Sequence, residues 1–244
     1  MKFYFYDSAS DTDQGAAKSF IKMTNGIATP KIGLATGNTP VGLYQCLVQA
    51  YNQKKISFKT FLTYNLDEYV GLTKDHPQSF AYFMNEHLFN GVDILEGNIH
   101  IPQGNVESPH VEAAKYEKLL EDAGALDVQI LSIGLNGHIG FNEPGEKLHS
   151  KTHVIELTED TRRVNSKSFP SFEEVPLSAI TLGLGTIMKA KKILFIAKGF
   201  EKADIIQQAF EGPLTTDVPG SLLQLHPNIE VHLDKEAASK LARI

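Results

Sequence analysis

The chain has 244 residues, 42% of them hydrophobic, which is enough to bury a sizeable core. A net charge of −6 without any Lys/Arg-rich block argues against a nucleic-acid partner, and the single cysteine, Cys46, excludes an intrachain disulfide framework. No apolar run approaches the length of a membrane span, so no membrane association is expected. The apolar stretch within residues 1–6 is too short for a signal peptide, and polar residues follow it directly. This favours a cytoplasmic location.

Strand and helix patterns alternate along the whole chain. Short apolar runs predict strands at residues 3–6, 31–35, 61–66, 98–102, 128–133, 153–157, 179–182, 192–197 and 229–233. Apolar residues at helical spacing follow most of these runs, and a last helix is predicted at 235–241. This order predicts an α/β fold of three α-β-α layers with a mostly parallel, open, Rossmann-like sheet, in a single domain over residues 1–244.

Residues 36–40, Thr-Gly-Asn-Thr-Pro, directly follow one predicted strand and precede a helical pattern. Thr39 is a favourable N-cap and Pro40 a favourable first helical residue. Free backbone N–H groups and the helix dipole favour an anion at such a junction. The segment is therefore either a phosphate cradle or an ordinary capped turn, and it matches neither a Walker loop nor the full dinucleotide fingerprint.

Two adjacent carboxylates, Asp67 and Glu68, stand directly after the predicted strand 61–66. Adjacent carboxylates are commonly only solvated. Ligands of open α/β sheets, however, bind at the carboxyl ends of the strands. This position makes Asp67 a candidate site residue.

Residues 134–145, Gly-Leu-Asn-Gly-His-Ile-Gly-Phe-Asn-Glu-Pro-Gly, follow another predicted strand. Four of these twelve residues are glycine, which lets the backbone take positive φ and approach a ligand closely. His138 and Glu143 have the residue types of a proton-transfer pair with a tuned pKa. The plainer alternative is a Gly-rich turn that carries a solvated histidine and glutamate.

Two cationic segments lie further along the chain. Residues 158–167 are polar and then cationic, and the stretch at about 158–177 is predicted as a lid that closes over an anion, with a solvated surface helix as the alternative. Lys202 falls in the first turn of a predicted helix, where the helix dipole disfavours a cation unless an anion binds there. The loops after parallel strands should gather four candidates at one edge of the sheet: Asn38, Asp67, His138 and Lys202.

Three segments together resemble the signatures of glucosamine-6-phosphate deaminases. They are 66–69 (Leu-Asp-Glu-Tyr), 76–79 (His-Pro-Gln-Ser) and 136–144 within the glycine-rich stretch. The resemblance covers essentially the whole chain. It implies a NagB-type fold and a hydrolase that converts D-glucosamine 6-phosphate and water to D-fructose 6-phosphate and ammonia in amino-sugar catabolism. It also implies that the enzyme uses no metal and no organic cofactor.

The resemblance further implies a role for each site residue. His138 would open the pyranose by moving a proton to the ring oxygen, and Glu143 would orient His138 and tune its pKa. Asp67 would take the C2 proton and return it to C1, and Asn136 stands where many members have a second aspartate. The substrate phosphate would meet Gly37, Asn38, Thr39, Lys167 and Lys202.

Two of these phosphate contacts depart from the family pattern. Asn38 stands where Gly or Ser is usual, and Lys167 stands where Arg is usual. A lysine keeps the charge but loses the bidentate fork of arginine. We therefore expect a phosphate site that is retained but weaker.

Several alternatives stay open. The amino sugar could be galactosamine 6-phosphate. A 6-phosphogluconolactonase needs no base at C2, so Asp67 speaks against it, and a sugar-phosphate-sensing regulator would carry an appended DNA-binding segment. A metal-dependent isomerase would need a ligand pair such as His149 and His153, but their turn-to-strand sequence is not expected to place them on one face.

Some longer members of the family form hexamers that N-acetylglucosamine 6-phosphate activates. Their effector-binding serine, arginine and lysine correspond here to Glu146, His153 and Ile155. Glu146 would repel a phosphate, His153 is mostly uncharged at neutral pH by its reference pKa of about 6.5, and Ile155 has no donor. We therefore expect no such activation, and a monomer or small homo-oligomer.

Overall fold

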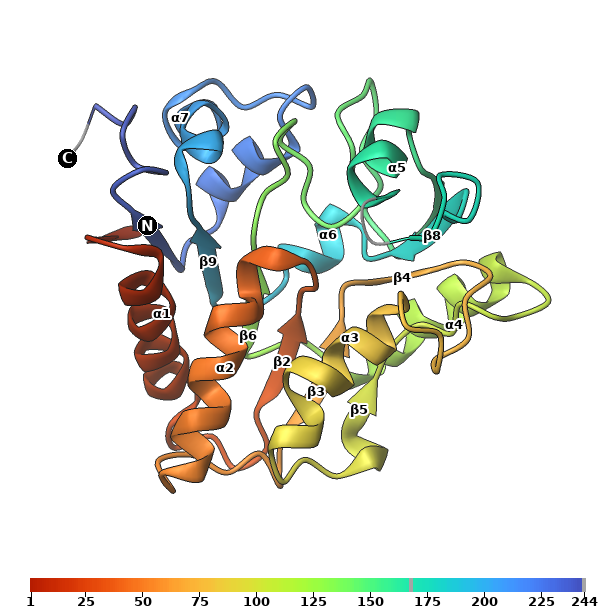
Figure 1. Ribbon diagram of the computed structural model, residues 1–244, viewed down its shortest axis with the longest axis horizontal. Helices are drawn as coiled ribbons and strands as arrows, with labels where there is room; N and C mark the ends of the chain where they lie inside the picture. The colour runs from red at the N-terminus through yellow and green to blue at the C-terminus, as the bar shows by residue number, and fades with distance from the viewer. Residues whose placement is uncertain (167–168, 243–244) are drawn as a thin grey trace.

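The computed structural model describes residues 1–166 and 169–242 of the chain (Figure 1). A seven-stranded sheet runs in the order β1-β10-β9-β6-β2-β3-β5, and all neighbouring strands are parallel. Its strands are β1 Lys2–Tyr6, β2 Lys31–Leu34, β3 Leu62–Asn65, β5 Ile99–His100, β6 Val128–Leu131, β9 Ile193–Ala197 and β10 Ile229–Asp234. The predicted open, parallel, Rossmann-like sheet is confirmed.

Helices cover both faces of this sheet. One face packs against α1 Ala9–Thr24, α2 Asn38–Asn52 and α3 Phe80–His87, which lie in front in Figure 1. The other face packs against α4 Pro109–Ala123, α6 Leu184–Ile187 and α7 Ala203–Glu211. Side chains alternate along β9 between these two cores, because successive residues of a strand point to opposite faces. Within the described ranges, no helix is both long and apolar enough to span a bilayer.

A second, antiparallel sheet stands beside the first, with strand order β4-β8-β7. Its strands are β4 Asp67–Tyr69, β8 Ser178–Thr181 and β7 His153–Glu156, and α5 Glu159–Asn165 follows β7. The sequence predicted β7 and β8 as strands but gave no strand at β4 and no separate sheet. Asp67 is consequently a strand residue, paired with Thr181 of β8.

Two helix predictions are wrong. The segment 235–240 forms turns in place of the predicted helix, and the Asp234 carboxylate stabilises them by accepting the Ala237 N–H at 2.8 Å. The helix expected to be capped by Thr39 begins at Asn38, with Gly37 as its N-cap at φ 98°. Short 3-10 turns complete the fold: η1 Phe89–Gly91, η2 Glu96–Asn98, η4 Phe200–Lys202 and η5 Pro219–Leu225.

Candidate active site

The site lies where three neighbouring strands of the parallel sheet end. The strands β6, β2 and β3 are adjacent, so the segments that follow them leave the sheet at one edge. The arrowheads of β2 and β9 point to this edge in Figure 1, with α7 and α5 on either side. The glycine-rich segment, Gly37 and Asp67 therefore come from one edge, as predicted from the strand pattern.

The segment 134–145 forms a tight turn directly after β6. The Gly134 N–H donates to the His138 carbonyl at 3.0 Å, and the Gly137 N–H donates to the Gly134 carbonyl at 3.0 Å. A Cβ at Gly134 would lie 2.1 Å from Cε1 of His138, so only glycine lets the imidazole lie against the backbone. The turn fixes the ring of His138, whose side chain is 27% exposed.

The side chains of Asn136, His138 and Glu143 form one hydrogen-bonded set. Nδ2 of Asn136 lies 2.6 Å from Oε2 of Glu143, and Oδ1 of Asn136 lies 2.7 Å from Nδ1 of His138. The carboxylate can only accept, so the amide nitrogen of Asn136 faces it and the amide oxygen faces the imidazole. That assignment makes Nδ1 of His138 the protonated nitrogen, which leaves Nε2 as the basic ring atom.

Glu143 is bound by a residue that the sequence did not single out. The hydroxyl of Thr161, in α5, donates to Oε1 of Glu143 at 2.6 Å. Burial by itself would raise the pKa of Glu143, but the contacts with His138, Thr161 and Asn136 outweigh it and lower that pKa to about 2. Glu143 is therefore ionised at neutral pH. The only sequence signal for Thr161 is its place in the predicted lid, because the contact joins two different segments.

Asp67 lies against the same glycine-rich turn. A Cβ at Gly140 would lie 3.4 Å from Oδ2 of Asp67, so the Gly140 backbone packs beside the carboxylate. Asp67 is 6% exposed, and burial, followed by the charge of Glu68, raises its pKa to about 8. A carboxylate with a raised pKa is a stronger proton acceptor once it is ionised.

Two lysines were predicted at this site. The ammonium of Lys202, at the junction of η4 and α7, donates to the Ile133 carbonyl at 2.7 Å, directly before the glycine-rich turn. Burial lowers the pKa of Lys202. Lys167 lies outside the described residues. The structure thus brings Lys202 to the same edge as His138.

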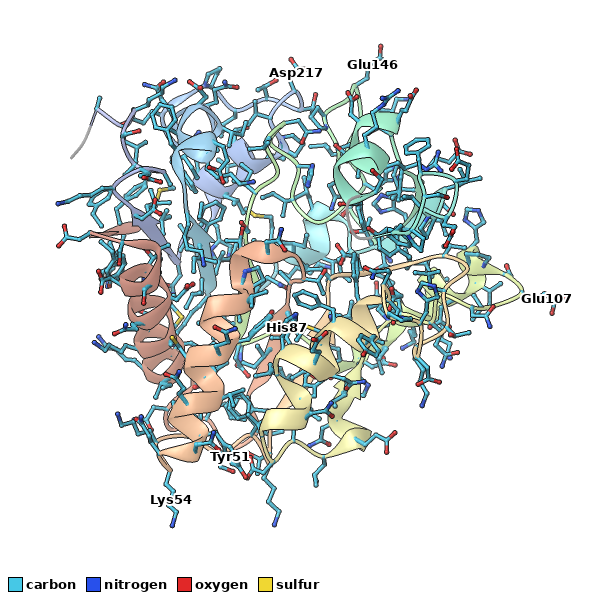
Figure 2. The ribbon with its side chains drawn as sticks, in the orientation of Figure 1. Tyr51, Lys54, His87, Glu107, Glu146 and Asp217 are labelled. Carbon is cyan, nitrogen blue, oxygen red and sulfur yellow. The ribbon has the colours of Figure 1, made fainter. Side chains whose placement is uncertain are left out.

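The outer end of the motif is acidic. The Gly145 N–H donates to the Thr216 carbonyl at 3.3 Å, which joins the end of the motif to the turn before η5. Figure 2 shows Glu146 and Asp217 projecting outward at this edge of the molecule, and both are exposed. Negative charge therefore lines the outer end of the motif.

The rings of His149 and His153 stack with centroids 4.1 Å apart. The two rings therefore lie side by side, although the sequence was not expected to place them on one face. Within residues 1–166 and 169–242, no three His, Cys, Asp or Glu side chains form a group that could hold a metal ion.

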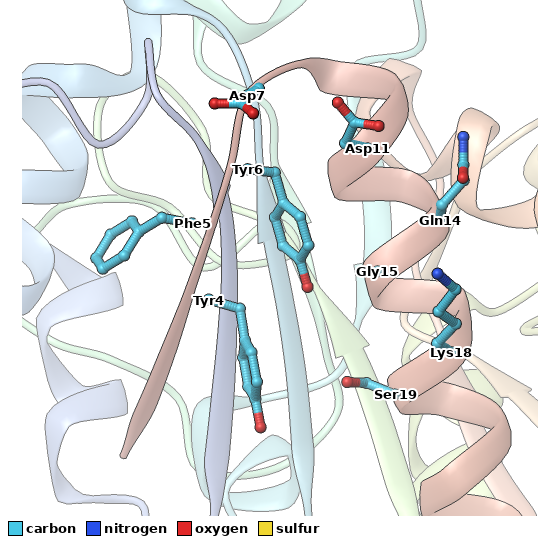
Figure 3. A pocket seen from close by; sticks show the side chains of 9 residues that line it. All are labelled: Tyr4, Phe5, Tyr6, Asp7, Asp11, Gln14, Gly15, Lys18 and Ser19. Carbon is cyan, nitrogen blue, oxygen red and sulfur yellow. The ribbon is translucent and has the colours of Figure 1, made fainter.

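A hollow of about 500 Å³ lies elsewhere, between β1 and α1 (Figure 3). Tyr4, Tyr6 and Lys18 are among the residues that line it. β1 is an edge strand, and β10, β9 and β6 separate it from β2. The hollow is therefore distinct from the site at His138 and Asp67.

The chain is similar to known proteins over most of its length. Residues 8–232 match the family model described as glucosamine-6-phosphate isomerases/6-phosphogluconolactonase. A glucosamine-6-phosphate deaminase of Thermoanaerobacter pseudethanolicus is 53% identical over 85% of this chain and 82% of its own length. A deaminase of the same name from a Geobacillus species is 45% identical over 98% of this chain and 95% of its own length. A solved structure of a monomeric glucosamine-6-phosphate deaminase superposes with a TM-score of 0.95 at 39% identity, covering 99% of this chain and 100% of that one.

Proposed function

The chain belongs to the family of glucosamine-6-phosphate isomerases and 6-phosphogluconolactonases, and from this membership we propose that it is a glucosamine-6-phosphate deaminase. The family description covers two activities, and the two relatives that match 85% and 98% of the chain at 53% and 45% identity carry the deaminase name. One observation carries the choice: a buried carboxylate, Asp67, lies beside the turn that holds His138. Lactone hydrolysis needs no base at C2, whereas aldose-ketose isomerisation does.

The first step that we propose is opening of the pyranose ring by His138. The hydrogen bond from Nδ1 to Asn136 leaves Nε2 as the atom that exchanges a proton with the sugar. When Nε2 carries a proton, the ionised Glu143 stabilises the resulting imidazolium through its contact of 3.5 Å with Nδ1. Nε2 takes the proton of the O1 hydroxyl and delivers it to the ring oxygen O5. The C1–O5 bond breaks as the C1=O bond forms, which yields the open-chain aldose.

Asp67 then transfers a proton between two carbon atoms. Its carboxylate takes the proton from C2, the carbon that bears the amine, and returns it to C1. The ammonium group on C2 gives up a proton to O1, so C1 becomes a hydroxymethyl carbon and C2 becomes an imine carbon. Water adds to that carbon, and the products are ammonia and the ketose D-fructose 6-phosphate. The raised pKa of Asp67 matches a base that must hold a carbon-derived proton during the transfer.

We assign phosphate binding to the turn at Gly37, Asn38 and Thr39 together with Lys167 and Lys202. Gly37 is the N-cap of α2, where backbone N–H groups and the helix dipole favour an anion. Lys202 supplies positive charge from η4. The turn η4 follows β9 and α2 follows β2, and β6 lies between these two strands in the sheet. A bound phosphate would position C1 and C2 at Asp67, since binding energy remote from the reacting atoms can be used for orientation.

The experiment that tests this function is ammonia release from purified protein, measured with glucosamine 6-phosphate and, in parallel, with galactosamine 6-phosphate. We expect ammonia and fructose 6-phosphate in equal amounts from the glucosamine compound, and a much lower rate with its epimer. A preference for the epimer would reassign the substrate. Hydrolysis of 6-phosphogluconolactone without any ammonia release would contradict the proposed activity and indicate a 6-phosphogluconolactonase.

We further propose that catalysis uses no metal and no organic cofactor. Turnover that survives dialysis against a chelator supports this, and turnover restored only by added metal contradicts it.

We propose that the protein is a monomer or small oligomer, which is supported by the solved relative described as monomeric. We also propose a cytoplasmic location, which fits a metabolic substrate. We also propose that the segment at about 158–177 acts as a lid over the bound phosphate.

A further inference from the structure

A hydroxyl from α5 reaches the carboxylate that orients His138. We propose that Thr161 is a positioning residue for proton transfer: it holds Glu143, and through Glu143 it holds Asn136 and His138. This inference rests on the function proposed above, because it concerns the ring-opening step of that reaction. Thr161 does not touch the reacting atoms in this scheme and acts only through Glu143.

Both oxygens of the Glu143 carboxylate are engaged, and Thr161 accounts for one of them. Oε2 receives the Asn136 amide at 2.6 Å and lies 3.5 Å from Nδ1 of His138. Oε1 receives the Thr161 hydroxyl at 2.6 Å. The side chain of Glu143 is only 8% exposed, so water is a poor substitute for a lost donor. Without Thr161 the Oε1 atom loses its donor, and the carboxylate that binds Asn136 and His138 through Oε2 is held less firmly.

The structure fixes Thr161 in this position from two directions. Thr158 is the N-cap of α5, and its hydroxyl donates to Oγ1 of Thr161 at 3.1 Å. Oγ1 of Thr161 is therefore already an acceptor, so its own proton is directed to Glu143. Thr161 itself is 8% exposed. A buried hydroxyl with both a donor and an acceptor has a single orientation.

The neighbouring residue, Arg162, fastens α5 to the following loop. Its guanidinium donates to the carbonyls of Phe172 and Val175 at 3.1 and 3.0 Å and lies 4.3 Å from the centroid of the Phe172 ring. Arg162 and Thr161 thus tie α5 to two different parts of the molecule.

The test compares three variants with the wild-type enzyme. Thr161→Val keeps the shape and removes the donor, Thr161→Ala removes the donor without any risk of a clash, and Thr161→Ser keeps the hydroxyl. The matched control is Thr186→Val. Thr186 lies in α6, and its hydroxyl also donates to a buried carboxylate, that of Glu117, at 2.8 Å. Ammonia release gives kcat and KM, and the thermal midpoint reports the folding of each variant.

We expect kcat to fall roughly tenfold in Thr161→Val and Thr161→Ala, with KM within about twofold, since a lost hydrogen bond to a charged group has about that effect. Thr161→Ser should keep kcat within about threefold of the wild type. Thr186→Val should lower the thermal midpoint and leave kcat unchanged. A kcat for Thr161→Val within twofold of the wild type overturns the inference, and so do equal losses in the Ser and Val variants.

A spectroscopic readout separates positioning from a general structural effect. In protein with ¹⁵N-labelled histidine, the ring signals of His138 are identified by their absence from the spectrum of His138→Gln, and they should show protonated Nδ1 in the wild type and in Thr161→Ser. Thr161→Val should shift His138 toward a mixture of tautomers, and Thr186→Val should not. An unchanged His138 spectrum in Thr161→Val contradicts the inference even when kcat falls. Wild-type protein that releases no ammonia would instead refute the proposed function.

Discussion

Asp67 and Glu68 are consecutive residues of β4, yet their carboxylates have opposite surroundings. Glu68 accepts the N–H groups of Tyr69, Phe80 and Ala81 at 2.8, 2.9 and 2.9 Å, so it caps the start of α3. Asp67 points to the other face of the strand, against the backbone of Gly140. The Glu68 carboxylate is thereby used to hold α3, and the Asp67 carboxylate is the one to which we assign the role of base.

Asp67→Asn should nearly abolish ammonia release while substrate binding is kept, because an amide cannot accept the C2 proton. General-base losses are typically on the order of 10² to 10⁴ in rate. Steady-state kinetics measures the loss, and calorimetric titration of the variant with substrate measures the binding. Turnover within about threefold of the wild type would remove Asp67 from the role of base.

The same substitution should stabilise the fold at higher pH. The pKa of Asp67 is raised from 3.8 to about 8, so the folded protein holds a proton that the unfolded chain has lost, and the wild type loses stability as pH rises between these values. The amide that replaces the carboxyl group does not titrate. The thermal midpoint of Asp67→Asn should therefore exceed that of the wild type by a margin that grows from pH 4 to pH 8 and then levels off. Exposed Asp75→Asn is the control, and a margin independent of pH would contradict the assignment.

His138→Gln should reduce turnover of the cyclic substrate far more than turnover of an open-chain analogue. Its assigned task is to open the ring, and an open-chain compound does not need that step. A reduction of roughly 10² or more for the cyclic sugar is expected for the loss of a general acid. Equal losses on the two substrates would mean that His138 acts at a different step.

Lys202→Ala should mainly raise KM. It removes a charge-assisted contact with the phosphate, worth roughly 1.5–3 kcal/mol, and Lys167→Ala should behave in the same way. Lys192→Ala is the matched control, because its ammonium also donates to a backbone carbonyl, that of Met23 at 3.2 Å, but lies before β9, at the opposite edge of the sheet. If both active-site variants keep the wild-type KM, the phosphate binds elsewhere and the turn at 36–40 loses its assignment.

The enzyme should follow hyperbolic kinetics and should not respond to N-acetylglucosamine 6-phosphate. Glu146 occupies the position of the effector-binding serine of longer relatives, and it is exposed at the edge that also carries Asp217 (Figure 2). Two carboxylates repel a phosphate. Saturation curves with and without the acetylated sugar measure this, and a sigmoidal curve that becomes hyperbolic with the effector would be the contrary result.

Local patterns were enough to predict the strands of the parallel sheet and most of the helices that follow them. Apolar runs of the right length identified β6 and β9, and glycines with a histidine and a glutamate marked the motif at 134–145. Such features depend on neighbours in the chain, since strand propensity and positive φ are properties of short segments. The sequence also predicted that Asp67 and His138 lie at the same edge of the sheet, because the carboxyl ends of parallel strands are all on one side.

Only the tertiary structure decided contacts between segments far apart in the sequence. The pairing of Asp67 with Thr181 created β4, which no local pattern indicated, because the strand is three residues long and exists only through its partner. The hydrogen bond from Thr161 to Glu143 spans 18 residues and depends on where α5 packs. The predicted helix at 235–241 failed for the same reason: the Asp234 carboxylate that organises its turns also binds the Gly199 N–H, from the end of another strand. Hydrogen bonds and burial between distant segments outweigh local propensity, which differs by only about 1 kcal/mol per residue between most residue types.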